Sequence, residues 1–383
     1  RRIPNAWHFR FALNLVFTAQ WFRSGGLRCS PLNAALGSTG EFRFVKKQLI
    51  TKQTRARRKK MARVQNRKRR SPRLVSNIRK HVNKTFNNKF GVEHALDMYA
   101  SSFVTLPAEA IYEKEMLQQH KSVIDNCHIY VIGYLPRVDF QGAEQVGDDL
   151  KLSFLVCNQE KELWIPSIPS HLSFNVEDGY HYLADEKGNR FWWSDMEMMQ
   201  MLHKQSEKLH FEVKYIGQAY GKNGSRSALD RLVKHETLQK IAIKGVPDGY
   251  KLSLLLLEVE SNTSMVTAFT PNAKSKDTDA SRIKAGLDKL FGTSDPERIS
   301  LYEAAMIRYF SPEYNKEFKN SFPSTNLKIL QDCYEKDFSA VFAQICIDEL
   351  PFMLFSDSVE PKQYHISKHD LHKDSDRKVF FCV

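Results

Sequence analysis

A chain of 383 residues is long enough for two or three domains, and 42% apolar residues suffice to build a packed core. The formal net charge of +13 is unevenly placed, because Phe42–Val92 holds 19 basic residues and no acid, whereas Glu93–Val383 holds 33 basic and 43 acidic residues. No run of about 18 apolar residues occurs, so we expect no membrane-spanning helix.

The six cysteines form no C-x-x-C pair, and no histidine stands near them at the spacing of a zinc finger. This distribution favours reduced, mostly buried thiols in a cytoplasmic protein over a disulfide framework or a zinc site. The cysteines are Cys29, Cys127, Cys157, Cys333, Cys346 and Cys382.

Residues 1–92 are predicted to form a basic arm that is disordered or helical. An apolar stretch at Phe11–Phe17 is compatible with a signal or transit peptide and equally with a translated upstream region. The positive charges within each of the runs Arg55–Lys60 and Arg67–Arg70 repel one another until phosphates neutralise them. Nucleic-acid contact is one interpretation of these runs. The other is a solvated, partly non-native extension with a later start such as Met61.

Residues 93–208 are predicted to form an accessory domain that begins with helices and continues with strands. Helical patterns cover Glu93–Tyr99 and Ala108–Met116. Three segments rich in β-branched and aromatic residues then predict a small sheet, namely His128–Tyr134, Lys151–Cys157 and Glu162–Ile165. After them we expect a hairpin over 179–193 that turns near Lys187–Asn189, and a helix over Asp195–Gln205.

Residues 209–330 alternate between strand and helix patterns, and residues 331–383 are taken as a C-terminal extension. The strand His210–Ile216 and the loop Gly217–Ser225 lead into a helix that carries Leu229, Leu232, Val233 and Leu238 on one face. The apolar run Tyr250–Glu258 is typical of a central strand. The pattern then predicts an exposed loop at Pro271–Ser281 and an amphipathic helix over Arg298–Phe310 that ends before Pro312.

This region also carries the side chains that phosphodiester hydrolysis requires. A carboxylate can hold Mg²⁺, an arginine can clamp the phosphate, and a tyrosine or histidine can relay a proton from water. The candidates are Tyr215 at the end of a strand, Arg231 and His235 at i and i+4 on one helix face, Glu303 beside an apolar stripe, and Asn315.

The order of these residues resembles the GIY-YIG endonuclease family. Tyr215-Ile-Gly217, Arg231…His235, the strand at 252–257, Glu303 and Pro312-Glu-Tyr-Asn315 follow one another as the family's elements do. The resemblance covers residues 209–320. It implies that Glu303 binds Mg²⁺ or Mn²⁺, that Arg231 stabilises the phosphate, that Tyr215 and His235 position or deprotonate the water, and that Asn315 holds the site together.

The resemblance also implies an α/β, more narrowly α+β, fold in which a small antiparallel sheet flanked by helices forms the nuclease core. The β-rich domain and the basic arm precede that core. The first half of the motif is not in its usual place, ten residues before Tyr215. The nearest candidate is Ile129-Tyr130, which would make the small β-region an insertion between two hairpin strands.

Each candidate residue also has a plainer interpretation. Tyr215 could be a half-buried strand aromatic, Arg231 and His235 a solvated helix face, and Asn315 a turn residue. Glu303 is the hardest to explain without a partner, because a buried charge costs several kcal/mol unless it is paired or metal-bound.

The resemblance implies a DNA substrate and a role in restriction, phage defence or mobile-element biology. A local patch of Lys214, Lys222, Arg226, Arg231 and Lys234 could contact phosphates. The alternative is a non-catalytic nucleic-acid-binding protein with a degenerate nuclease fold.

Overall fold

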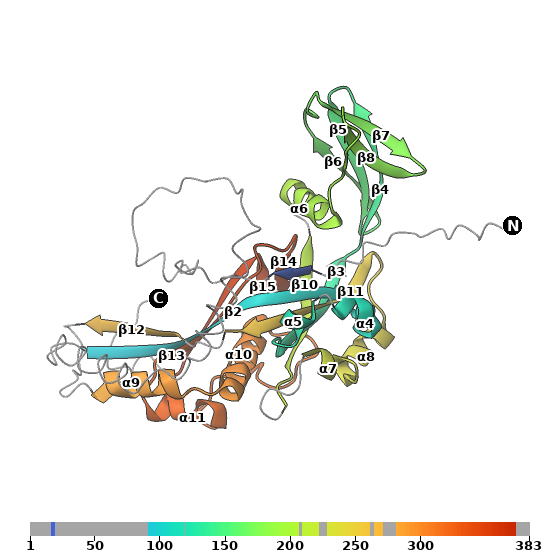
Figure 1. Cartoon of the computed structure of the whole chain (residues 1–383). Coiled ribbons are helices and arrows are strands. Elements are labelled where there is room, and N and C mark those ends of the chain that lie inside the picture. Colours follow the sequence, from blue (N-terminus) through green and yellow to red (C-terminus); the bar gives the residue numbers. More distant parts are fainter. Residues whose placement is uncertain are drawn as a thin grey trace. The chain divides into compact units, whose positions relative to one another are not determined.

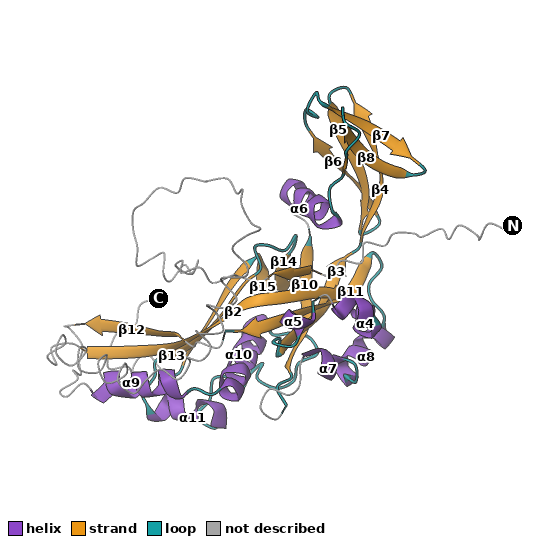
Figure 2. Ribbon diagram, in the orientation of Figure 1, coloured by secondary structure: helices purple, strands orange, loops and turns teal. Residues whose placement is uncertain are grey.

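The computed structural model describes residues 17–19, 91–118, 120–206, 209–221, 228–260, 264–270 and 281–372. These residues form an α+β structure, in agreement with the predicted class (Figures 1 and 2). Within them, no helix has the length and apolar character needed to cross a membrane. Lys222, Arg226, both basic runs and most of the predicted loop at 271–281 lie outside the described residues.

The chain divides into two compact units. The first comprises Arg1–Trp21, Ala95–Val266 and Lys289–His372, and the second comprises the remaining segments. In the second unit, the described part includes most of helix α9 (Ser281–Gly292), where the His94 ring nitrogen Nε2 bonds the Arg282 carbonyl over 2.9 Å. All residues discussed below as a site belong to the first unit.

One mixed sheet dominates the first unit. Its strands stand in the order β15 (Val359–Lys362), β14 (Met353–Ser356), β10 (His210–Gln218), β3 (Ile129–Pro136), β11 (Tyr250–Val259), β2 (Gly91–Pro107), β13 (Ala340–Cys346) and β16 (Tyr364–Asp370). The pairs β10–β14 and β2–β13 are parallel, and the other neighbours are antiparallel. Strand β1 (Phe17–Ala19) pairs with β2, and β12 (Ser264–Thr270) is a further strand.

The main sheet is buried on both faces. On β11, Leu255 and Leu257 belong to one core, whereas Leu254 and Leu256 belong to another. This explains the nearly continuous apolar run of the predicted central strand, which is confirmed. The first core includes α6 (Asp195–Ser206), α10 (Asp295–Phe310) and α11 (Lys328–Glu335). The second includes η1 (Ala108–Tyr112), α4 (Lys114–Gln118), α5 (Lys121–Ile124), α7 (Ala228–Leu232) and α8 (Glu236–Lys244).

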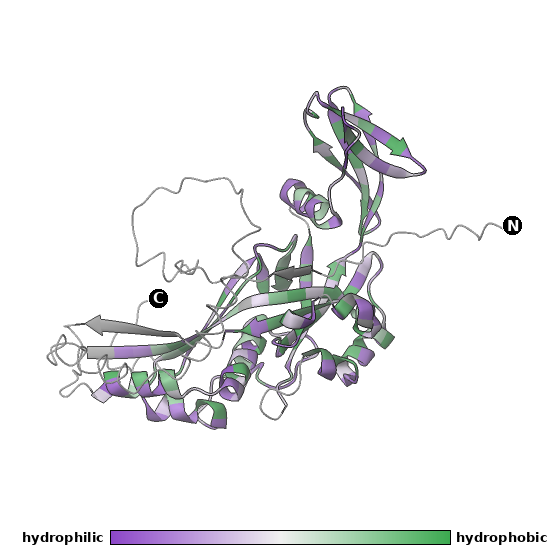
Figure 3. Ribbon diagram, viewed as in Figure 1, coloured by the Kyte–Doolittle hydropathy of each residue, from purple (hydrophilic) through white to green (hydrophobic). Residues whose placement is uncertain are grey.

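Helix α10 is the longest helix among the described residues, and its ends are well marked in the sequence. Asp295 and Glu297 stand in its first turn, where the helix dipole favours acids, and Pro296 fits there because no backbone donor is needed. At the other end Ser311 adopts a left-handed conformation with φ 47°, and Pro312 follows. Helices α8 and α10 each mix hydrophobic and hydrophilic residues (Figure 3), as expected for helices with one face on a core.

Residues 137–209, between β3 and β10, carry two small sheets and α6. One sheet comprises β4 (Val138–Val146), β5 (Asp149–Val156) and β6 (Gln159–Ile165), and the other comprises β7 (Leu172–Glu177), β8 (Tyr180–Asp185) and β9 (Arg190–Phe191). The predicted hairpin over 179–193 is confirmed, because Ala184 pairs with Arg190. The predicted helix at 195–205 is also confirmed.

Two predictions for the N-terminal half of the described chain are wrong. Glu93–Tyr99 forms part of strand β2 rather than a helix. This segment contains good helix formers, but β13 pairs with β2 from Ala95 to Ala100, and tertiary pairing overrides local propensity. The predicted strand at 128–134 is correct as a strand, yet it lies in the main sheet and not in the small one.

The single helix predicted around Arg231 and His235 is also wrong. Helix α7 ends at Leu232, and His235 has an extended backbone with φ −90° and ψ 110° as the N-cap of α8. Arg231 and His235 therefore do not share a helix face. The break also exposes Val233, which is 37% exposed although the helical pattern groups it with the buried leucines.

Candidate active site at the free edge of β10

The second half of strand β10 has a neighbouring strand on only one side. Strand β14 pairs with β10 from His210 to Glu212 and no further, whereas β3 pairs with it from Glu212 to Gln218. Beyond that point the segment after α10 covers the edge. The Tyr314 amide donates to the Lys214 carbonyl over 3.1 Å. The edge is thus closed by a loop instead of a strand.

Asn315 completes this edge with its side chain. The Ile216 amide donates to Asn315 Oδ1 over 2.9 Å, and Asn315 Nδ2 donates to the Ile216 carbonyl over 2.8 Å. One buried amide group thus satisfies both backbone groups of the residue between Tyr215 and Gly217. Asn315 therefore holds the strand that carries Tyr215.

A second tyrosine comes from β3, across the strand pair. Tyr130 stands opposite Gly217, and its ring stacks on that of Tyr215 with 6.2 Å between the ring centroids. The close approach depends on glycine, because a Cβ at residue 217 would lie 2.6 Å from Tyr130 Cζ. The arrangement places the two tyrosines side by side, with the 137–209 segment inserted between their strands.

His235 fixes the direction of the hydrogen bonds among these rings. Its Nδ1 accepts from the Leu238 amide over 3.1 Å, and its Nε2 lies 2.9 Å from the Tyr130 hydroxyl. Since a backbone amide can only donate, Nδ1 carries no proton, and the neutral ring donates from Nε2 to Tyr130. The Tyr130 hydroxyl then keeps its own proton to donate elsewhere, and the stacked Tyr215 lies close enough for Tyr130 to influence its pKa.

Burial and charge keep these groups in defined protonation states. Burial, with a smaller contribution from the Arg231 charge, lowers the pKa of His235 to about 4, so the ring is neutral at pH 7. Burial raises the pKa of Tyr130, against the hydrogen bond and charge of Arg231. Burial and the charge of Glu303 raise the pKa of Tyr215. Both phenols therefore keep their protons at neutral pH.

Arg231 is exposed near the end of α7, and its guanidinium lies close enough to Tyr130 to act against the rise in the pKa of that phenol. It lies close enough to both tyrosines and to His235 to act on them electrostatically. The structure thus brings Arg231 and His235 together around Tyr130 even though they sit on two different helices.

Glu303 lies in the middle of α10, 9% exposed and surrounded by apolar neighbours. Gln218, the last residue of β10, bonds the Glu303 carboxyl through both its backbone and its side chain. The Gln218 side chain also bonds the Ser300 hydroxyl, one turn earlier on α10, over 3.3 Å. Burial, then the charge of Glu317, raises the pKa of Glu303 to about 8 despite these hydrogen bonds.

A cavity of about 330 Å³ opens beside this edge. Tyr215, Glu303 and Asn315 line it together with residues of α8 and of the loop after α10. The lining residues not anticipated from the sequence are Glu236, Thr237, Lys240, Ile307, Tyr314, Lys316, Glu317 and Phe318. Their proximity to Tyr215 depends on long-range packing, so local sequence patterns gave no signal for them.

The predicted phosphate-contacting lysines differ in their surroundings. Lys214 bonds Glu212 over 2.7 Å and Glu313 over 3.2 Å, so two carboxylates compensate its charge. Lys234 is exposed in the turn between α7 and α8. Lys240 and Lys316, which the sequence did not single out, are exposed on the cavity wall.

The residues present fit a hard divalent cation. In the described part of the chain no group of three or more His, Cys, Asp or Glu could hold a metal ion. The Glu303 carboxyl, however, is nearly buried, faces the cavity and stands near a second carboxyl, Glu317. Mg²⁺ is commonly held by one or two carboxylates with several waters.

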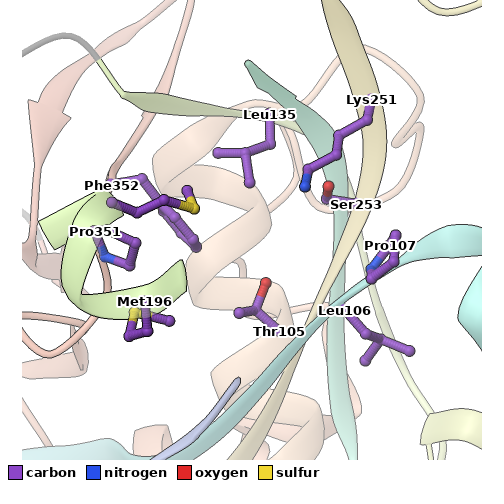
Figure 4. Close-up of a pocket in the computed structure, with 10 residues that line it drawn as sticks. Thr105, Leu106, Pro107, Leu135, Met196, Lys251, Ser253, Pro351 and Phe352 are labelled. Carbon is purple, nitrogen blue, oxygen red and sulfur yellow. The ribbon is translucent and has the colours of Figure 1, made fainter. Parts of the chain in front are cut away.

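A much smaller cavity, about 10 Å³, lies elsewhere in the first unit between β11, β2 and α6. Figure 4 shows the Lys251 side chain pointing toward Ser253 there. The buried Ser253 hydroxyl has no hydrogen-bond partner among the described atoms. A space of this size holds about one water molecule, which would satisfy the hydroxyl. It does not offer room for a substrate.

No family model, no curated protein and no solved structure matches this chain. Its function is therefore inferred from the geometry at the edge of β10.

Proposed function

We propose that this protein is an endonuclease of the GIY-YIG type that hydrolyses phosphodiester bonds of DNA with Mg²⁺ or Mn²⁺. One observation carries the proposal. Tyr130, Arg231 and His235 come from three separate elements and lie around Tyr215, which lines a single cavity together with Glu303. Chance packing does not explain why a buried carboxyl, two stacked phenols and an arginine meet at a strand edge.

The proposed mechanism assigns one task to each group. Arg231 clamps a phosphate oxygen and stabilises the charge that develops on it. Tyr215 faces the cavity and orients the attacking water. Glu303 holds the cation, and a bound Mg²⁺ or Mn²⁺ would supply positive charge for the transition state and the departing oxygen.

Three residues act through others in this proposal. His235 directs its Nε2 proton to Tyr130, Tyr130 stacks on Tyr215, and Asn315 holds the strand that carries Tyr215. His235 has no nitrogen left to accept a proton from water, because Nδ1 is occupied by the Leu238 amide. It is therefore a positioning residue and not a base.

Substrate contact would come from cations near the cavity and from the basic arm. Arg231, Lys234, Lys240 and Lys316 are exposed in this part of the molecule. The segment Glu93–Val383 is nonetheless acidic, so strong electrostatic attraction of DNA along its length requires residues outside this segment. We place the activity in the cytoplasm, because the four described cysteines are free thiols, and in restriction, phage defence or mobile-element biology.

The test is cleavage of supercoiled plasmid with and without Mg²⁺ or Mn²⁺. We expect metal-dependent nicking that Glu303→Ala and Arg231→Ala each reduce by at least about 100-fold, as for other groups that stabilise transition-state charge. Glu313→Ala and Arg137→Ala, outside the cavity lining, serve as matched controls that retain activity. Wild-type rates for both site variants would refute the proposal. Salt-sensitive DNA binding without cleavage in any metal would identify a non-catalytic binding protein instead.

A further inference from the structure

Glu317 is a second carboxylate on the wall of the candidate active site. It follows Asn315 by two residues, whereas Glu303 comes from the middle of α10, and both line the same cavity. Tyr215 lines the same cavity, so the three side chains border one space. Glu317 is the more exposed of the two carboxylates.

The segment that carries Glu317 is anchored on both sides. Asn315 bonds the backbone of β10 through two hydrogen bonds. Phe318 packs partly against the core of α10 in a left-handed conformation with φ 64°. The Arg308 guanidinium of α10 donates to the Lys319 carbonyl. These contacts hold Glu317 at the cavity and limit its movement away from Glu303.

No cation neutralises Glu317 within the part of the chain that the structure describes. The neighbouring acid Glu313 differs in this respect, because it pairs with Lys214 over 3.2 Å and with Lys244 over 3.9 Å. Glu303 is likewise bonded by the neutral side chain of Gln218 and not by a cation. A divalent cation between Glu303 and Glu317 would favour the ionised form of both carboxyls.

We propose that Glu317 is a second ligand of the divalent cation held by Glu303, a role that rests on the endonuclease function proposed above. Oxygen atoms of two carboxylates would balance the charge of one Mg²⁺ or Mn²⁺, and waters would complete its coordination. Ligands from α10 and from the segment after it would also fix the cation relative to Tyr215. Glu317 would thereby determine where the metal-bound oxygens stand.

The test measures metal binding by the full-length chain directly, without reference to cleavage. Tb³⁺ is a suitable probe, because energy transfer from tyrosines such as Tyr215 and Tyr314 on the cavity wall makes it luminesce. Displacement of Tb³⁺ by Mg²⁺ then gives the Mg²⁺ affinity. We expect Glu317→Gln to weaken Mg²⁺ binding by about 10-fold or more, the scale on which changes around a metal site act. Glu317→Asp, which keeps a carboxylate, should lose less Mg²⁺ affinity than Glu317→Gln.

Glu313→Gln is the matched control, since it removes an acid four residues away that already has cation partners. It should bind Mg²⁺ as the wild type does, and Glu303→Gln should abolish binding. Equal Mg²⁺ affinity of Glu317→Gln and the wild type would overturn the assignment of Glu317 while leaving the endonuclease proposal standing if the wild type still nicks DNA. A wild type that neither binds Mg²⁺ nor cleaves would overturn both.

Discussion

Gly217 shows how a single residue without a side chain makes the site possible. A Cβ at residue 217 would lie only 2.6 Å from the Tyr130 ring. The hydroxyl of that ring accepts a hydrogen bond from His235 Nε2. The glycine therefore has a packing role at this position, and the Tyr-Ile-Gly sequence acquires a physical meaning that the sequence did not reveal.

We expect Gly217→Ala to displace the Tyr130 ring and break its bond with His235. Overpacking of this kind costs about 1–3 kcal/mol of the free energy of unfolding. Plasmid nicking should fall at least about 10-fold. Gly292→Ala is the control, because a Cβ there meets nothing within 4 Å. Nicking assays and urea denaturation of both variants give the comparison, and equal behaviour of the two would contradict this account of Gly217.

The ionised carboxylate of Glu303 should lower the free energy of unfolding at high pH. Its pKa is 4.5 in an ordinary environment and about 8 in the folded protein, so the folded state holds a proton that the unfolded state releases between these values. The stabilising contribution is complete below pH 4.5 and is lost as the pH rises through 8. Without a divalent cation, Glu303→Gln should therefore match the wild type at pH 4.5.

At pH 9 the same variant should be more stable than the wild type by about 5 kcal/mol, from the size of the pKa difference. Denaturant unfolding at the two pH values measures this gap, and added Mg²⁺ should narrow it by stabilising the wild-type carboxylate. A stability difference that does not change with pH would show that Glu303 is not buried as described.

At the scale of elements, the edge of β10 is where sheet, helix and loop meet. The pairing of β14 with β10 stops at Glu212, and Asn315 bonds backbone groups of β10 that a longer β14 would have bonded. A strand there would have filled the space now occupied by the cavity. The side chain thus closes the edge and leaves room for a substrate.

Asn315→Ala should leave the Ile216 amide and carbonyl without partners. Each buried polar group left in this state costs about 1–3 kcal/mol. We expect a clear reduction in stability and faster hydrogen exchange at the Ile216 amide, together with weaker cleavage. Asn326→Ala, which replaces an exposed asparagine further along the same chain segment, should change none of these. Protection of Ile216 equal to that in the wild type would argue against the role given to Asn315.

For the molecule as a whole, charge is separated along the chain. The basic residues gather in Phe42–Val92, while the segment that carries the candidate site is acidic. Affinity for nucleic acid and catalysis should then be separable, because phosphate contacts provide binding and the cavity provides the chemistry.

Replacing Arg67, Lys68, Arg69 and Arg70 with glutamine should weaken DNA binding. The slope of log affinity against log salt concentration should decrease by about 0.9 for each phosphate that the arm no longer neutralises. The rate of cleavage at saturating DNA should stay the same, since none of the four lies in the described site. Fluorescence anisotropy over a salt series measures the binding slope, and single-turnover cleavage measures the rate. An unchanged salt slope would exclude the arm as the source of affinity.

The sequence by itself determined those features that depend on neighbouring residues. The strands at 210–218 and 250–259, the helix at 295–310 and the hairpin near Gly188 follow from periodicity, capping and turn chemistry. The types of side chain available for hydrolysis, and the burial expected for Glu303, were also visible in it.

Only the tertiary structure decided how these parts meet. Tyr130 reaches Tyr215 because β3 pairs with β10 across the inserted residues 137–209, and the register of that pairing places Tyr130 on Gly217. Segment 93–99 becomes a strand because β13 pairs with it from Ala95 onward, and His235 caps a helix because its Nδ1 reaches the Leu238 amide. Local propensities differ by less than about 1 kcal/mol per residue, whereas the burial and hydrogen bonding of a paired strand exceed that along its length. Contacts between distant segments therefore fix the site, and no local pattern encodes them.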